Sequence, residues 1–122
     1  MTYPTTHKLT TVHLDCYSPS VGSSPVAAYL RVPFRCQILK LTSVLYGAIT
    51  TADCSVATAV TGTAIPGGTI PIPQSGSAAG QVNSAIPSAS TFANEDDTIS
   101  FTPSLASGAN VACTFSAVLK QV

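Results

Sequence analysis

The stretch from residue 111 to residue 119 constrains the fold more than any other part of this sequence. An apolar side chain stands at every second position there, at Val111, Cys113, Phe115, Ala117 and Leu119. Successive side chains of a β-strand point to opposite faces, so this repeat predicts a strand with one continuous dry face. Because Ala112 and Val118 make the other face partly apolar too, we place this strand in the middle of a sheet.

Shorter stretches of the same kind recur along the chain, separated by clusters of Gly, Pro, Ser and Asn that are typical of turns. Apolar residues on both faces indicate that the strand over 36–46 is central, whereas Pro33 and Pro71 are typical of strand ends and sheet edges. Helical periodicity is nearly absent. The predicted strands cover residues 8–17, 28–34, 36–46, 54–60, a short stretch after the Thr61-Gly62 turn, 69–73, 81–86, a strand containing Ile99 and Phe101, and the closing strand.

The length and the number of strands together predict the architecture. A chain of 122 residues is one domain by the usual prior and can bury a real core. About eight strands without a helix imply an all-β, single-domain antiparallel β-sandwich or a small barrel. We assign residues 8–122 to this domain and residues 1–7, MTYPTTH, to an amino-terminal arm.

The scarcity of charge excludes several classes of function. Charged residues make up 8% of the chain, against about 25% in an average soluble domain. Five basic residues balance five acidic ones, so there is no basic surface to attract nucleic acid, and we expect none as a partner. Such a weakly charged surface also has little electrostatic protection against self-association. Gly and Pro interrupt the uncharged stretch 54–94 before it reaches the ~18 apolar residues of a membrane span, so we expect no membrane partner.

The cysteines are expected to be reduced. No apolar signal segment precedes the first predicted strand, which favours folding in a cytoplasm, where disulfides are rare. Each cysteine lies in an apolar strand pattern, where a free thiol behaves as a small hydrophobic side chain. We therefore predict four free thiols, at Cys16, Cys36, Cys54 and Cys113.

Three groups of polar residues are candidates for a catalytic or metal-binding site. His13 and Asp15 share one strand face and would form a base and its orienter if a Ser approached from another strand, but a solvated polar face is the favoured interpretation. The acidic run Glu95–Asp97 would suit calcium or a glycosidase, although a solvated turn is favoured. Histidine and cysteine spacing fits no zinc site. We expect no catalytic residue, no metal and no cofactor, and hence no enzyme.

Tyrosine and arginine are the side chains best suited to anchor an interface, because they are enriched among binding hot spots. Pro4 also stiffens the arm, which lowers the entropy lost on docking. The candidate contact residues are Tyr3, Pro4, Tyr29, Arg31 and Arg35.

The order of turn and strand motifs over residues 32–103 resembles the capsid decoration, or cement, proteins of tailed bacteriophages. The resemblance rests on Val32-Pro33-Phe34 followed by Arg35, on Leu45–Asp53 (LYGAITTAD), on Gly67-Gly68-Thr69-Ile70, on Gly76–Gly80 (GSAAG), and on the acidic turn. It implies a jelly-roll-like β-sandwich that binds the outside of an icosahedral head, bridges major capsid protein subunits and self-associates. The chain would then be made in the host cytoplasm and reside on the virion exterior.

The leading hypothesis is therefore a structural virion protein that stabilises a phage head. The alternative is a head-fibre or adhesin-like module that recognises a cell-surface glycan. The absence of Trp and the small number of aromatic residues count against that alternative.

Overall fold

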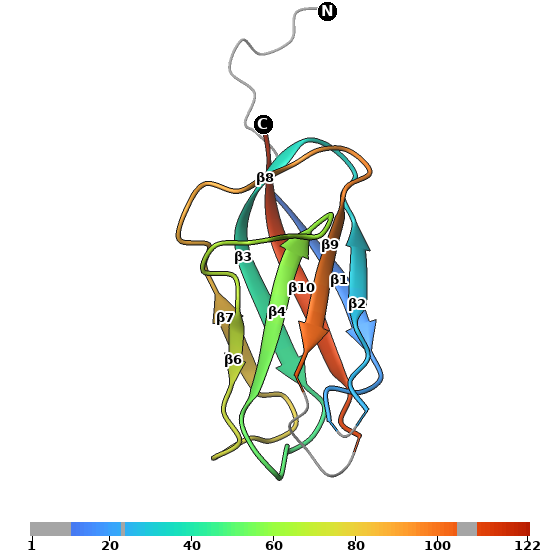
Figure 1. Ribbon diagram of the computed structural model, residues 1–122, viewed down its shortest axis with the longest axis vertical. Helices are drawn as coiled ribbons and strands as arrows, with labels where there is room; N and C mark the ends of the chain where they lie inside the picture. The colour runs from blue at the N-terminus through green and yellow to red at the C-terminus, as the bar shows by residue number, and fades with distance from the viewer. Residues whose placement is uncertain (1–10, 23, 105–109) are drawn as a thin grey trace, which may run out of the picture.

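The protein is an all-β sandwich of two antiparallel sheets, as the sequence predicts (Figure 1). A computed structural model describes residues 11–22, 24–104 and 110–122. Its described residues form no helix, and therefore no helix that could cross a membrane. The predicted arm over residues 1–7, with Tyr3 and Pro4, lies outside the described residues.

Each sheet contains five strands. Sheet A has the order β1-β10-β3-β7, with β8 also paired to β3, and sheet B has the order β2-β9-β4-β5, with β6 also paired to β4. Figure 1 shows sheet B in front of sheet A. The strands of sheet A are β1 (Thr11–Ser18), β3 (Cys36–Leu45), β7 (Val82–Ala85), β8 (Phe92–Ala93) and β10 (Cys113–Gln121). Those of sheet B are β2 (Ala28–Arg31), β4 (Cys54–Val60), β5 (Thr63–Ala64), β6 (Ile70–Ile72) and β9 (Thr98–Pro103).

The strand pairs are nested along the chain. β1 pairs with β10, β2 with β9, β3 with β7, and β4 with β6, all antiparallel. The first two strands therefore pair with the last two, and the middle strands pair with each other inside them. As predicted, the closing strand β10 and the doubly apolar β3 are both central in their sheet.

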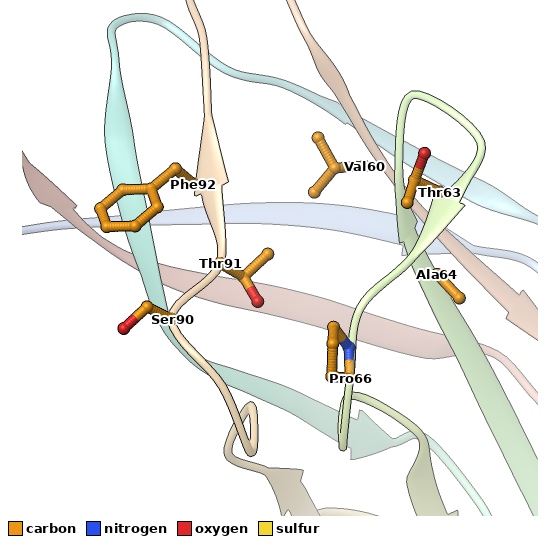
Figure 2. Close-up of a pocket in the computed structure, with 7 residues that line it drawn as sticks. All are labelled: Val60, Thr63, Ala64, Pro66, Ser90, Thr91 and Phe92. Atoms are coloured by element: carbon orange, nitrogen blue, oxygen red, sulfur yellow. The ribbon is translucent and has the colours of Figure 1, made fainter.

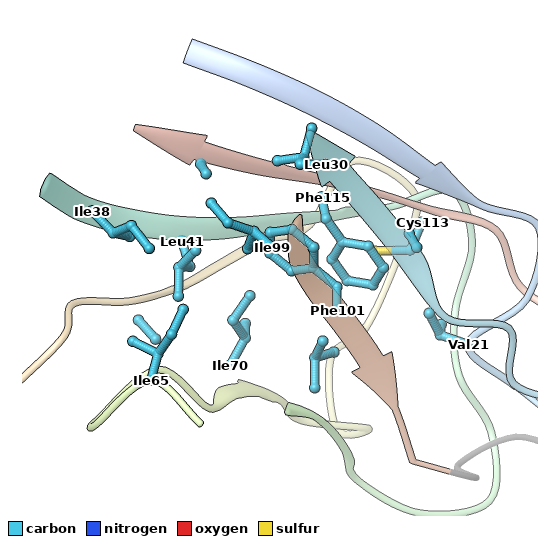
Figure 3. Close-up of a cluster of buried hydrophobic side chains, with 14 of the residues drawn as sticks. Val21, Leu30, Ile38, Leu41, Ile65, Ile70, Ile99, Phe101, Cys113 and Phe115 are labelled. Carbon is cyan, nitrogen blue, oxygen red and sulfur yellow. The ribbon is translucent and has the colours of Figure 1, made fainter. Parts of the chain in front are cut away.

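The core lies between the two sheets. The rings of Phe101 from β9 and Phe115 from β10 are stacked with their centroids 5.0 Å apart and their planes at 4° (Figure 3). Both side chains are fully buried, among aliphatic residues that both sheets supply. The alternation over residues 111–119 thus places Cys113, Phe115, Ala117 and Leu119 of β10 in the core.

The clearest differences from the predicted strands are at β2 and β8. β1 is described from Thr11 onward, so its predicted start at residue 8 lies outside the described residues. β2 ends at Arg31: Val32 N still donates to Asp97 O at 2.8 Å, but Pro33 has no N–H to continue the ladder. The two-residue strand β8 was not predicted, because it exists only through its pairing with Cys36 and Gln37 of β3.

The β4–β5 hairpin turns at Thr61 and Gly62, where the sequence predicts a turn. Both residues have positive φ, 45° and 85°, as a two-residue hairpin turn of the primed type requires. After β5 the chain passes close beneath β4, and Thr58 Oγ1 donates to Gly68 O at 2.7 Å. A Cβ on Gly68 would overlap Thr58 Oγ1 and the Ile65 side chain, so only glycine fits this approach without movement of its neighbours.

Candidate interaction surface

The outer face of sheet A carries a row of residues that runs across four strands. Tyr17 of β1 lies opposite Thr114 of β10, which lies opposite Val44 of β3, which lies opposite Val82 of β7. Tyr17 and Val82, at the two ends of the row, are 55% and 61% exposed. Adjacent strands are about 4.8 Å apart, so the row is about 14 Å long.

A second tyrosine broadens the row. The ring of Tyr46 meets that of Tyr17 edge to face, with the centroids 5.8 Å apart and an interplanar angle of 61°. The Tyr46 hydroxyl lies 2.7 Å from Thr114 Oγ1, which fixes the ring over the strand. We call Tyr17, Val44, Tyr46 and Val82 the sheet A patch. Large exposed apolar side chains gathered in this way are typical of interaction sites.

The outer face of sheet B has a different character. Its central row joins Tyr29, Ser100, Ala59 and Ala64 across four strands, so that one aromatic ring borders small side chains. A salt bridge of 2.7 Å between Arg31 and Asp96 lies at the same side. Of the large exposed apolar side chains, this row contains only Tyr29, whereas the sheet A patch contains Tyr17, Tyr46 and Val82.

The predicted contact residues do not form one surface. Tyr29 and Arg31 point outward from β2 on sheet B, and the Arg31 guanidinium is already bound to Asp96. Arg35 precedes β3 and its guanidinium lies over the Phe92 ring, 5.7 Å from the centroid. Val44 and Val82 were not among the contact residues predicted from the sequence. Their apolar character at outward positions of predicted strands could be seen in the sequence. The register that aligns them with Tyr17 could not, because it depends on how four strands pair.

His13 and Asp15 point outward from β1, and the fold places a serine beside them. Asp15 lies opposite Ser116 of β10, whereas His13 lies opposite Val118. In a catalytic triad the histidine stands between the serine and the carboxylate, and here the carboxylate is the residue paired with the serine. The face is open to solvent, and none of the described cavities borders these three residues.

The acidic run forms a turn, as favoured from the sequence. Asp97 Oδ2 accepts a hydrogen bond of 2.8 Å from Asn94 N, and Asp96 has a φ of 68° while its carboxylate binds Arg31. Within residues 11–22, 24–104 and 110–122, no three His, Cys, Asp or Glu side chains gather closely enough to hold a metal ion.

All four cysteines are free thiols. Burial raises the pKa of Cys113 to about 12 and that of Cys16 to about 11, and it raises the pKa of Cys36 and Cys54 as well. A raised pKa keeps the thiol protonated at neutral pH, and the thiolate is the nucleophilic form. These side chains are therefore suited to packing and poorly suited to catalysis.

One cavity is lined by neutral side chains. It has a volume of about 410 Å³ and lies between the β4–β5 hairpin and the segment that enters β8 (Figure 2). The Phe92 ring points away from the hairpin in this view. A second cavity, of about 390 Å³, includes Asp53, whose Oδ1 accepts a hydrogen bond of 2.8 Å from Gln74 N at the entrance to β4. The lining of the first cavity is Val60, Thr63, Ala64, Pro66, Ser90, Thr91 and Phe92.

Comparison with known proteins finds similarity in structure and not in sequence. No protein-family model and no curated protein matches the chain. The fold is similar to that of a chain in the solved "Cyanophage Pam1 capsid asymmetric unit", with a TM-score of 0.58 and 10% identity over 100% of this chain and 94% of that one. It is also similar to a chain of the "Acidic stable capsid structure of Helicobacter pylori bacteriophage KHP30", with a TM-score of 0.54, 13% identity and 91% coverage of both chains. The shared feature is the whole fold, since each alignment spans nearly all of both chains.

Proposed function

We propose that the chain is a structural virion protein, a decoration or cement subunit that binds the outer surface of a phage head and bridges major capsid protein subunits. The observation that carries the proposal is the similarity in fold, along nearly the full length of both chains, to chains in two phage capsid structures. The nested strand pairing supports it further, because pairing of the outer strands around the inner ones is the winding expected of a jelly roll.

The sheet A patch is the surface we assign to the shell. Tyr17, Tyr46 and Val82 are each more than half exposed, and they form one contiguous group with Val44 on strands that the core holds rigidly. Docking would remove this apolar area from water, and tyrosines in such positions contribute strongly to binding. The outer face of sheet B, with its small side chains, would then point away from the shell.

The mechanism would be mass action. A subunit that binds the assembled shell and not its separated parts stabilises the shell by RT ln(1 + [L]/Kd), or about 2.7 kcal/mol when its concentration is 100 times Kd. Since charged residues are only 8% of the chain, the attachment would depend on apolar burial and shape. Salt would weaken it less than it weakens an interface built on ion pairs.

The test uses phage shells assembled without this chain, to which the purified protein is added. We expect saturable binding and a higher melting temperature of the shell. Val82→Asp would place a carboxylate within the apolar contact and should weaken binding by tenfold or more, because an unpaired charge is costly to desolvate. Thr102→Asp is the matched control, since Thr102 is exposed on the outer face of sheet B and should retain the original affinity.

Two results would contradict the proposal. One is the absence of binding to shells combined with specific binding on a glycan array, which would favour the adhesin-like alternative. The other is unchanged shell binding by Val82→Asp with loss of binding by Thr102→Asp, which would transfer the contact to sheet B.

A further inference from the structure

Among the described residues, no strand pairs with the outer edge of β1. On its other side β1 pairs with β10. An edge of eight residues presents unpaired N–H and C=O groups, and it can add a strand from another chain. By contrast, the opposite edge of sheet A is divided between the four residues of β7 and the two of β8.

The inner side of β1 is incompletely covered. Val12, Leu14 and Cys16 point inward but are only half-buried. The inward residues of the neighbouring β10, Phe115, Ala117 and Leu119, are fully buried. β2, the strand of sheet B that contacts β1, has four residues where β1 has eight, so it covers only part of β1. A strand added beside β1 would shield these apolar side chains.

We propose that β1 pairs antiparallel with β1 of a second copy, centred on Leu14, and so joins the two sheets A into one continuous sheet. Directly opposed residues of an antiparallel pair point to the same face. Each outward residue must therefore lie opposite an outward residue of the partner. The outward residues of β1 are the odd-numbered ones, Thr11, His13, Asp15 and Tyr17, so the two-fold axis must pass through a residue and not between two residues.

Charge selects one register among those that remain. Centred on Leu14, the pairing places His13 opposite the partner's Asp15 and Asp15 opposite the partner's His13. Centred on Asp15, it would oppose two carboxylates, and centred on His13, two imidazoles. An imidazole N–H opposite a carboxylate can donate a hydrogen bond to it, whereas two opposed carboxylates repel each other. Neither residue has a charged partner across β10, where Val118 and Ser116 stand.

This arrangement would also serve attachment to a shell. The two-fold axis of such a pair is perpendicular to the sheet, so both sheet A patches face the same side. Two patches on one rigid body bind with a high effective concentration for the second contact. The pairing itself does not depend on the proposed function; only this use of it does.

The first test is the self-association of the full chain, measured by sedimentation equilibrium. We expect a reversible monomer–dimer equilibrium, weak because one strand pair buries little area compared with a standard interface. His13→Asp opposes like charges at both ends of the pair and should raise the dissociation constant about tenfold. The exchanged variant H13D/D15H restores both opposed pairs and should return it to within about threefold of the original. Circular dichroism checks that each variant is folded.

The second test identifies the register by mild oxidation of single-cysteine additions. Leu14→Cys places two new thiols directly opposite each other, at a Cα spacing within the range that a disulfide spans, and should yield a covalent dimer. His13→Cys and Asp15→Cys should yield little, because each lies opposite a different residue. The unsubstituted chain controls for its own four thiols.

Three results would overturn the inference: a monomer at every concentration tested, a closed trimer, or equal cross-linking of the three cysteine variants. Shell binding by a strictly monomeric chain would overturn this inference and leave the proposed function standing. Dimerisation without shell binding would do the reverse.

Discussion

At the scale of single residues, the cysteines are the side chains whose ionisation the fold changes most. Cys113 is fully buried beside Phe115 (Figure 3), and the Cys54 thiol donates to Ser104 O at 3.4 Å. Burial disfavours the thiolate, which raises each pKa. Their effect on the protein should therefore be seen in its stability at alkaline pH.

We expect the free energy of unfolding to fall as the pH rises above 9.0, the ordinary pKa of these thiols. Below that pH both states hold the thiol protons, so the thiols add no pH dependence. Between 9.0 and about 12 the unfolded chain loses protons that folded Cys16 and Cys113 retain, so unfolding becomes easier. Urea unfolding at pH 8 and pH 10.5 measures the fall. A double variant with alanine at both positions should show a smaller one, and an equal fall would contradict this explanation.

Thr61 is a residue that the hairpin holds under strain. Its φ is 45°, and a β-branched residue rarely adopts a left-handed conformation. Asn tolerates it better, and Asn-Gly is the preferred pair for this turn. Thr61→Asn should therefore raise the free energy of unfolding by about 0.5–1 kcal/mol. Thr63→Asn, in β5 and outside the positive-φ turn, is the control. Thermal unfolding would contradict the idea if both variants were equally stable or if Thr61→Asn were less stable than the original.

At the scale of elements, the β4–β5–β6 segment depends on the close approach of Gly68 to β4. Thr58 is buried, and its hydroxyl donates a hydrogen bond to Gly68 O. Ile65 N donates to Thr58 O at 3.0 Å. These contacts hold the loop before β6 against the edge of sheet B, where β6 pairs with β4. The approach leaves no space for a side chain.

Gly68→Ala should lower the free energy of unfolding by about 1–3 kcal/mol, because its methyl group overlaps Thr58 and Ile65. Gly47→Ala is a matched control, since the nearest atom to its Cβ would be a Val111 methyl at 3.8 Å, which is ordinary contact. Chemical denaturation of the two variants gives the comparison. If both lost the same stability, the close approach would not be the cause.

Strands and turns with a strong local sequence pattern could be predicted. Strands and contacts that exist only because distant segments pair could not. The unbroken alternation over 111–119 predicted β10 and its central position, and the Thr61-Gly62 turn was recognised from Gly. β8 has only Phe92 and Ala93, too few residues for any alternation. The ion pair of Arg31 with Asp96 joins residues 65 positions apart, and no local pattern indicates such a pair.

At the scale of the whole molecule, the sandwich was predictable and its interaction surface was not. Tyr17, Val44 and Val82 come from three strands, and they form one row only through the register of four strands. Composition indicated a weakly charged surface suited to contacts with other subunits, but exposure had to come from the structure. The candidate residues chosen by type, Tyr29 and Arg31, lie on the other sheet. The choice between the two outer faces is thus the central structural question for the proposed function.

A cryo-electron microscopy reconstruction of phage shells to which the purified chain has been added answers that question most directly. We expect density for the β-sandwich on the outside of the head, with the outer face of sheet A and the patch of Tyr17, Val44, Tyr46 and Val82 against the major capsid protein. A particle without this density, or one in which the sandwich meets the shell through the outer face of sheet B, would contradict it.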